Sequence, residues 1–149
     1  MSVVYKLGGT SQCKTGYDKL IEILKTSDKQ NYVVLSAVSG VTNNLVKFTE
    51  TKDIDYINKA IKLNDDLIKS LGLEINILDK IYRLYDDLYT LAKEYIKSFE
   101  IDDIYCKSEI IGFGEVLSTN IFNIYINTIY IDKIHSLLNS YDYIFSKKE

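Results

Sequence analysis

The stretch that decides the fold is VVYKLGGTS, residues 3–11, a run of β-prone residues that ends in a glycine turn. Downstream of it, apolar residues recur at spacings of three and four, which predicts an amphipathic helix carrying Tyr17, Leu20, Ile21 and Leu24 on one face. The chain therefore opens with the order strand, glycine turn, helix.

The same order repeats further along the chain. YVVL, residues 32–35, is a compact apolar run, SAVSG, residues 36–40, is small and turn-forming, and helical spacing follows at Val41, Leu45 and Phe48. Two strands joined by a helix of this length are most simply parallel neighbours, and each places its following loop at the same edge of the sheet. Ligands of open α/β sheets bind at that edge, so we expect a site there.

The middle and end of the chain do not repeat the strand–turn–helix order. Two apolar stripes at helical spacing, separated by Gly72, predict a helical hairpin over about residues 53–99, with its tyrosines in the core or an interface and not in a base-stacking platform. After the hairpin, GFGE, residues 112–115, predicts a turn that opens a helix running to about Asn127. A strand is expected at residues 129–131.

Composition narrows the class of protein. The 149 residues, 46% hydrophobic and 26% charged, fit one domain spanning residues 1–149. The net charge of −3 gives no footprint for nucleic acid or an anionic membrane. One histidine and two distant cysteines, Cys13 and Cys106, are too few for a zinc cluster or a disulfide framework. Because no apolar run approaches about 20 residues and the N-terminus lacks a signal-peptide pattern, we expect a cytoplasmic protein without a membrane partner.

The first glycine turn is a candidate anion site. Lys6 places a cation at the end of a strand, and Gly8 and Gly9 lack the Cβ that would keep backbone N–H groups from a phosphate. The helix that we expect to begin near Thr15 adds its positive dipole end. The pattern matches neither GxxxxGK[ST] nor GxGxxG. A glycine pair also serves a turn alone, so both interpretations stay open.

Two further segments carry polar groups at turns. Residues 36–43, SAVSGVTN, offer three hydroxyls and an amide, whereas a helix N-cap needs only one side-chain oxygen. Residues 112–115 set the Glu115 carboxylate in the first turn of the helix that they open, where a helix dipole favours a carboxylate. It either complements that dipole or pairs with the ammonium group of a ligand.

Together the three segments resemble the N-terminal part of the catalytic domain of aspartokinases, members of the amino acid kinase family. The open motifs of that family look like KFGGTS, SAxSGVTN and SFGExLS, and this chain has KLGGTS at 6–11, SAVSGVTN at 36–43 and GFGEVLS at 112–118. The order and the helical excursion between the second and third motifs also match. The resemblance implies an α/β fold, a partial amino-acid-kinase-like sandwich with a mostly parallel sheet, flanking helices and a long helical hairpin insertion.

The resemblance also implies a reaction and its residues. The γ-phosphoryl group of ATP, with Mg²⁺ as the metal, would pass to the side-chain carboxylate of L-aspartate or a related amino acid, the first step of lysine, threonine and methionine synthesis. Lys6 would neutralise the transferring group, Gly8, Gly9 and Ser36 would line the phosphate path, and Thr42 and Glu115 would bind aspartate. No residue of this chain is assigned to the metal.

Departures from the family pattern bear on activity. Leu7 replaces a phenylalanine, Gly112 a serine and Val116 a basic residue. The family's nucleotide-binding half, with its GRGGSD-like motif, and its ACT domains have no counterpart here, and Arg83, the only arginine, matches no such motif. We therefore expect an N-terminal lobe that is inactive alone and covers its open sheet edge as a homodimer or with a complementary chain. The alternative is a non-catalytic relic that binds an amino acid or a partner kinase chain.

Overall fold

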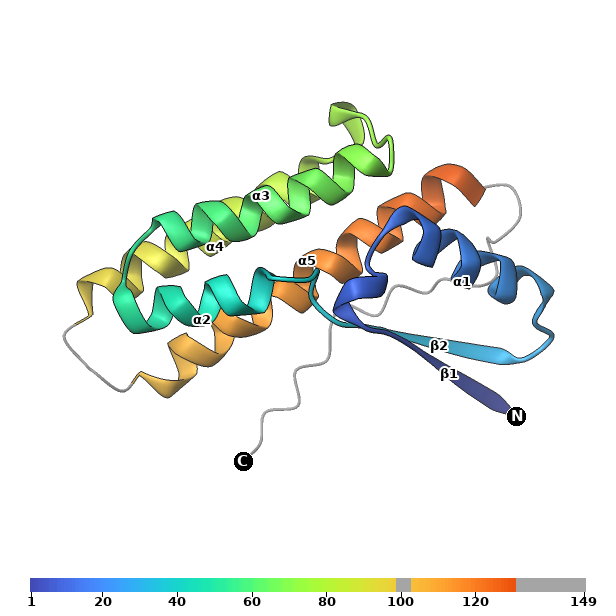
Figure 1. The fold of residues 1–149 in the computed structure, drawn as a ribbon, viewed down its shortest axis with the longest axis horizontal. Helices are drawn as coiled ribbons and strands as arrows, with labels where there is room; N and C mark the ends of the chain where they lie inside the picture. The colour runs from blue at the N-terminus through green and yellow to red at the C-terminus, as the bar shows by residue number, and fades with distance from the viewer. Residues whose placement is uncertain (99–102, 131–149) are drawn as a thin grey trace.

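Helices cover one face of a small parallel sheet in the part of the chain that the computed structural model describes, residues 1–98 and 103–130 (Figure 1). The elements in chain order are β1 (Ser2–Leu7), the 3₁₀ turn η1 (Gly9–Ser11), α1 (Lys14–Thr26), β2 (Gln30–Leu35), α2 (Val41–Thr51), α3 (Asp55–Ser70), the 3₁₀ turn η2 (Ile75–Ile77), α4 (Asp79–Lys97) and α5 (Ile104–Tyr130).

Strands β1 and β2 pair in parallel, from Ser2 opposite Gln30 to Leu7 opposite Leu35, as the strand–helix–strand pattern predicts. Side chains alternate between the two faces of a strand. On one face Tyr5, Leu7, Val33 and Leu35 pack with the core. On the other face apolar side chains are exposed: Val4 to 66%, Tyr32 to 46% and Val34 to 49%. The sheet therefore has one covered and one open face.

The covered face lies against α1 and α5, on the same side of the sheet in Figure 1. The predicted stripe of α1 is buried as expected, at Tyr17, Leu20, Ile21 and Leu24. The Tyr17 ring meets Phe122 and Tyr125 of α5 at centroid distances of 4.9 and 6.0 Å. Aromatic packing thus joins the first helix to the last.

The predicted helical hairpin is present as α3 and α4, which lie side by side with α2 and α5 (Figure 1). Gly72 ends the first arm with φ of +70°, a conformation that glycine adopts without strain. Two hairpin tyrosines are core residues as predicted. Tyr85 is 6% exposed and donates to Asp65, and Tyr95 is 3% exposed and donates to the carbonyl of Thr49.

Two expectations about the last helix are wrong. Residues 112–115 form no turn but lie inside α5, which begins eight residues earlier at Ile104, and Ile129 and Tyr130 are the last residues of that helix and not a strand. Ile131 lies outside the described residues. Gly114 serves close helix packing and does not end the helix. A short apolar run such as residues 129–131 does not distinguish strand from helix by periodicity alone.

The predicted fold class is confirmed: a partial α/β arrangement with a parallel sheet, flanking helices and a helical hairpin. Within the described ranges, no helix is both long and apolar enough to cross a membrane.

Candidate functional site

The two strands deliver their following turns side by side. The Ser36 N–H donates to the Leu7 carbonyl at 3.0 Å, which extends the parallel ladder by one bond beyond the last strand residue. The first turn (residues 8–11) and the second turn (residues 36–40) therefore leave the sheet at one edge, as expected for parallel strands.

The two glycines of the first turn have different environments. A Cβ built on Gly9 would lie 3.1 Å from the Ala37 carbonyl oxygen, so this glycine permits close contact between the two turns. A Cβ on Gly8 would meet nothing within 4 Å, and Gly8 is exposed. Its φ of −76° is open to any residue. Gly9 thus has a packing role, whereas Gly8 faces open space where a ligand has room.

Helix α5 supplies the third part of the site. A Cβ on Gly114 would lie 2.7 Å from Cβ of Ala37 and 3.0 Å from Cγ1 of Val41, so the helix touches the second turn at this glycine. One turn later, the buried Ser118 hydroxyl donates to the Ser36 carbonyl at 2.8 Å. The three sequence motifs therefore meet, and we call residues 8–11, residues 36–42 and residues 114–118 the motif cluster.

The structure places the predicted site residues around this cluster in different ways. Ser36 is half-buried between Leu7 and Ser118. Thr42 and Glu115 are half-buried, and each directly follows a residue of the Val41–Gly114 contact. Lys6 is exposed, on the open face of the sheet and opposite Val34 in register. Lys6 and Glu115 form no ion pair within the described residues.

The local electrostatics of Glu115 differ from the sequence expectation. Glu115 is the twelfth residue of α5 and not part of its first turn. Because the helix-dipole effect fades beyond the first turn, the dipole does not explain a carboxylate at this position. Glu115 differs from a surface glutamate because it is half-buried and follows Gly114, which lies against Ala37 and Val41.

Sequence reasoning missed two buried polar residues, Ser118 in the motif cluster and Gln12 directly after its first turn. Gln12, 4% exposed, donates from Nε2 to the Leu7 carbonyl at 3.2 Å and accepts from the Tyr17 hydroxyl at 2.6 Å. Ser118 is fully buried although it lies in the middle of an apolar helix. The signal was available, since a polar residue among buried apolar positions needs a hydrogen-bond partner. Burial raises the pKa of the Tyr17 hydroxyl, which keeps it a hydrogen-bond donor at neutral pH.

The N-terminus of α1 is closed by its own side chains. The Cys13 sulfur accepts from the Gly16 N–H at 3.5 Å, and Lys14 pairs with Asp18 at 2.6 Å. Asp18 also accepts from the Tyr125 hydroxyl of α5. The Lys14 hydrogen bond first, and then the Tyr125 hydrogen bond, lower the pKa of the Asp18 carboxyl. This cluster is a structural clamp between α1 and α5.

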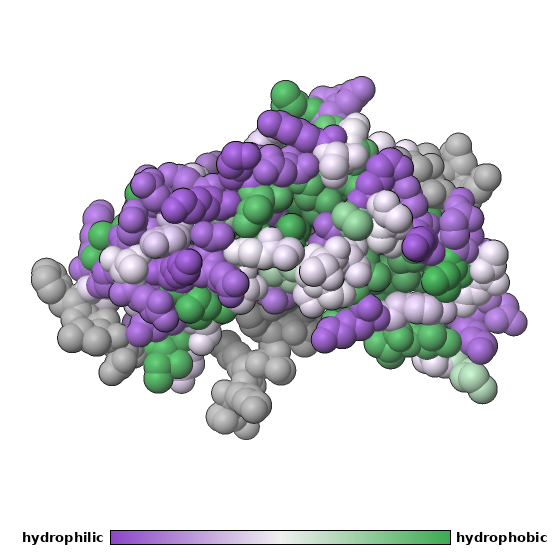
Figure 2. All heavy atoms as spheres, viewed as in Figure 1, coloured by the Kyte–Doolittle hydropathy of each residue, from purple (hydrophilic) through white to green (hydrophobic). Residues whose placement is uncertain are grey.

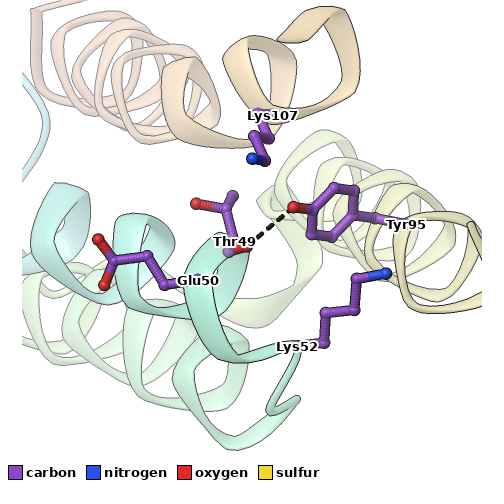
Figure 3. A pocket seen from close by; sticks show the side chains of 5 residues that line it. All are labelled: Thr49, Glu50, Lys52, Tyr95 and Lys107. Carbon is purple, nitrogen blue, oxygen red and sulfur yellow. Dashed lines mark hydrogen bonds between the residues drawn. The ribbon is translucent and has the colours of Figure 1, made fainter. Parts of the chain in front are cut away.

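A hollow lies at the C-terminal end of α2, lined by Thr49, Glu50, Lys52, Tyr95 and Lys107, with a volume of about 310 Å³ (Figure 3). Lys52, whose φ is +57°, donates to the Ser98 carbonyl at 2.7 Å and lies 5.0 Å from the centre of the Tyr95 ring. Thr49 follows Thr42 of the motif cluster by seven residues of α2, so at about 1.5 Å per helical residue the hollow begins about 10 Å along the helix from the cluster. Lys52, the best-defined cation of the hollow, stabilises the C-terminal ends of α2 and α4. We therefore assign no ligand to the hollow.

The donor set for a metal is poor. Among the residues that the structure describes, no group of three or more histidine, cysteine, aspartate or glutamate side chains could hold a metal ion.

Comparisons with known proteins bear on the family of the chain. No family model matches the chain. The chain is 30% identical over 137 residues to chloroplastic aspartokinase 1 of Arabidopsis thaliana, and 27% identical over 122 residues to the aspartokinase of Chlamydia pneumoniae. These matches cover 87% and 80% of this chain but 24% and 26% of the relatives, so the chain spans about a quarter of the length of the curated relatives it matches.

Solved structures give the same result. Aspartokinase III of E. coli in complex with aspartate and ADP superposes with a TM-score of 0.71 at 25% identity, over 85% of this chain and 29% of that one. The same enzyme with lysine and aspartate gives a TM-score of 0.69 at 22% identity, a likeness of fold. The fold is thus that of a part of aspartokinase III. Most of this chain is an aspartokinase-like segment.

Proposed function

We propose that this chain provides the aspartate-binding and phosphate-facing part of an aspartokinase-like phosphotransferase. In the reaction, a side-chain carboxylate oxygen of L-aspartate forms a bond to the γ-phosphorus of ATP, and the bond from that phosphorus to the ADP oxygen breaks. The observation that supports this best is the hydrogen bond from Ser118 to Ser36, which joins two motifs 82 residues apart. The similar enzyme that binds aspartate and ADP supports the same proposal.

The proposed roles are electrostatic. Phosphoryl transfer requires positioned positive charge and N–H donors more than covalent help from the protein. We assign the Lys6 ammonium to the charge of the transferring group, and the backbone at Gly8, Gly9 and Ser36 to the phosphate path. Gly8 has open space beside it, which a phosphate oxygen needs for close approach.

The proposed amino-acid pocket is assigned to Thr42 and Glu115. Glu115, half-buried and next to Gly114, would pair its carboxylate with the α-ammonium of aspartate, and the Thr42 hydroxyl would bind the same substrate. A half-buried carboxylate gives a charge pair more weight than a fully solvated one, because the local dielectric is lower. Glutamate and other relatives of aspartate are alternatives for this pocket.

Magnesium would enter as the metal of its ATP complex, and it would neutralise phosphate charge during transfer. Because the described residues offer no metal-holding group, no step is assigned here to a metal ligand of this chain.

The remaining groups of such a site would come from another chain or from further residues. Arg83, the only arginine, lies on α4 in the hairpin and is exposed. The apolar open face of the sheet, with Val4, Tyr32 and Val34, would be covered by a second copy or by a complementary chain. Figure 2 shows apolar surface over the strands. We place this assembly in the cytoplasm.

Calorimetric titration with L-aspartate and with ADP, separately, tests the proposal on the 149-residue chain. We expect aspartate to bind, and Glu115→Gln to abolish that binding without loss of helix content. Glu50→Gln, which neutralises an exposed carboxylate on α2, is the matched control and should bind as the parent chain does. Absence of aspartate binding in the parent chain, or equal binding by Glu115→Gln, would overturn the proposed pocket.

A coupled assay for ADP release with aspartate, ATP and Mg²⁺ separates catalysis from binding. Because the relatives are about four times as long as the matched segment, we expect no appreciable turnover by the chain alone. Aspartate binding without turnover would agree with a non-catalytic protein that binds an amino acid or a partner kinase chain. Turnover that Lys6→Ala abolishes would exclude that alternative.

A further inference from the structure

One threonine of α5 leaves its hydroxyl without a partner. In a helix, a threonine hydroxyl commonly donates to a carbonyl three or four residues earlier. Each of the other threonines that follow a full helical turn donates to a carbonyl of its own helix: Thr26, Thr49, Thr51, Thr90 and Thr128. Thr119, in the middle of α5, makes no side-chain hydrogen bond among the residues that the structure describes.

The neighbours of Thr119 explain this difference. The two carbonyls within reach of its hydroxyl are those of Glu115 and Val116, four and three residues earlier. The Glu115 carbonyl accepts from the Ser118 hydroxyl at 3.2 Å, and the Val116 carbonyl accepts from Asn120 Nδ2 at 2.8 Å. A carbonyl has two lone pairs, and one of them serves the backbone ladder of the helix. Both acceptors are therefore in use, and the Thr119 hydroxyl is left to donate to a group outside the helix.

The Thr119 hydroxyl is open to solvent although its side chain is half-buried. In the described part of the chain, the fully buried side-chain polar atoms that lack a partner are Asn31 Nδ2 and Asn64 Oδ1. The Thr119 oxygen also lacks a partner but is not one of these atoms, so it is not sealed inside the protein. A ligand can reach it.

Thr119 lies on the same face of α5 as Glu115. Side chains four residues apart are neighbours on a helix surface, with about 5–6 Å between their Cβ atoms. Gly114 and Ser118, the residues directly before these two, contact the second turn, and Phe122 packs on α1. Glu115 and Thr119 therefore border the surface where α5 meets the second turn and α1. A half-buried carboxylate and a hydroxyl without a partner stand there one helical turn apart.

An α-amino acid carries the two groups that this pair can bind. Its ammonium and its α-carboxylate are bonded to the same carbon atom, so a site that pairs the ammonium with a carboxylate needs a donor for the α-carboxylate close by. A hydroxyl is such a donor. In the proposed reaction the side-chain carboxylate of aspartate faces the phosphorus of ATP, which leaves the α-carboxylate to be held by the protein.

We propose that Thr119 is a substrate-binding residue, whose hydroxyl donates to the α-carboxylate of the amino acid that Glu115 holds by its ammonium group. The inference deepens the proposed function and rests on it for the class of ligand. It adds a specificity: the pocket recognises an amino acid by its free α-carboxylate as well as by its ammonium group.

The experiment compares Thr119→Val, which removes the hydroxyl and keeps the branched shape, with the control Thr90→Val, whose hydroxyl donates within α4. Calorimetric titration uses L-aspartate and β-alanine, which is aspartate without its α-carboxylate. A hydrogen bond of ordinary net strength corresponds to roughly a tenfold change in an equilibrium constant. Urea midpoints of the same variants report the hydroxyl without any ligand.

We expect Thr119→Val to bind L-aspartate about tenfold more weakly than the parent chain, whereas Thr90→Val and Thr119→Ser keep the parent affinity. β-Alanine should bind the parent at least about tenfold more weakly than aspartate does, and Thr119→Val should not weaken it further. The urea midpoint of Thr119→Val should not fall, because the hydroxyl that it removes has no partner in the protein.

The outcomes separate the two proposals. A parent chain that binds no aspartate would overturn the amino-acid pocket of the proposed function. Aspartate binding that Glu115→Gln abolishes and Thr119→Val leaves at the parent value would overturn the role of Thr119 alone. Equal weakening of aspartate and β-alanine by Thr119→Val would show that the hydroxyl does not bind the α-carboxylate. A clear fall in the urea midpoint would show that the hydroxyl is structural, and it would overturn the inference as well.

Discussion

The helical part of the molecule, α2 to α5, and the sheet part, β1 to β2 with α1, bury their apolar residues to different extents. In the helical part the inner faces are closed: Leu45, Phe48, Ile57, Ile81 and Leu88 are fully buried. In the sheet part the helices cover one face only, and Val4, Tyr32 and Val34 stay between 46% and 66% exposed on the other. Within the described residues, the helical part therefore has a closed core, whereas the sheet part leaves apolar side chains exposed on one face.

This difference separates stability from function. A closed helical core supplies most of the apolar burial and fixes α2 and α5, whose residues Val41 and Gly114 meet beside the second turn. The sheet contributes the strand ends, whose backbone groups form the motif cluster. The candidate site therefore lies where the closed part meets the open part. Variants in the two parts should behave differently, and the predictions below use that contrast.

The largest effect is expected in the helical core. Leu88→Ala removes a fully buried side chain of α4 and should lower the free energy of unfolding by about 3 kcal/mol, through lost burial and the cavity left behind. Ile96→Ala on the same helix, where the side chain is 39% exposed, should cost less than about 1 kcal/mol. Urea denaturation followed by circular dichroism measures both. Equal losses would contradict a closed core in this part.

A pair of glycines tests the sheet part. A Cβ on Gly16 would lie 2.1 Å from the Ser11 carbonyl oxygen, so Gly16→Ala forces η1 away from α1, at a cost of about 2 kcal/mol. Gly8→Ala meets no atom within 4 Å and should change stability by less than about 0.5 kcal/mol. Thermal unfolding of both variants provides the measurement. A neutral Gly16→Ala would mean that the contact between η1 and α1 is loose.

Much of the fold was predictable because its signals are local. The stripe at Tyr17, Leu20, Ile21 and Leu24 has the helix period, and the repeat of strand, turn and helix indicated a parallel pair. The α5 region was misread because it has apolar residues on several sides, so its periodicity is weak and its glycines look like a turn. Gly112 and Gly114 are instead helical, and Gly114 permits contact with Ala37.

The sequence indicated the residues of the candidate site, but not the buried hydrogen bonds that hold their backbone in place. The motif letters indicated Lys6, Ser36 and Glu115, whose roles stay predictions. They did not indicate Gln12 or Ser118, because a single polar residue reveals its partner only when residues as distant as Ser36 and Ser118 are folded together. Long-range hydrogen bonds leave no period in the sequence, so only the tertiary structure shows which carbonyl each side chain holds.

Self-association of the chain tests the proposal that a second copy covers the open face of the sheet. Val34→Glu places a charge in the middle of that face, beside Lys6 in register, and should lower any self-association constant at least tenfold while stability changes by less than about 0.5 kcal/mol. Ile75→Glu on η2, where the side chain is 74% exposed, is the matched control and should associate as the parent does. Sedimentation velocity over a concentration series decides. A parent chain that is monomeric throughout would leave only a complementary chain as the partner.

The smallest effect is expected at the clamp between α1 and α5. Asp18 accepts hydrogen bonds from Lys14 and Tyr125, and these lower the pKa of its carboxyl from the ordinary value of 3.8. A lowered folded-state pKa contributes stability above the unfolded pKa, and that stability is lost as the pH falls through the folded pKa. Because Asp18 keeps 35% of its side chain exposed, solvent screening limits the contribution to less than about 1 kcal/mol.

Asp18→Asn should therefore be slightly less stable than the parent at pH 7, and the difference should shrink as the pH is lowered below 3.8. Asp66→Asn is the control, since the Lys62–Asp66 pair lies on α3 with both side chains more than half exposed and no partner on another helix among the described residues. Urea midpoints measured between pH 3 and pH 7 test the sign. If the Asp18→Asn difference grew toward low pH, the carboxyl would be stabilised in its protonated form, and the clamp would act through Tyr125 alone.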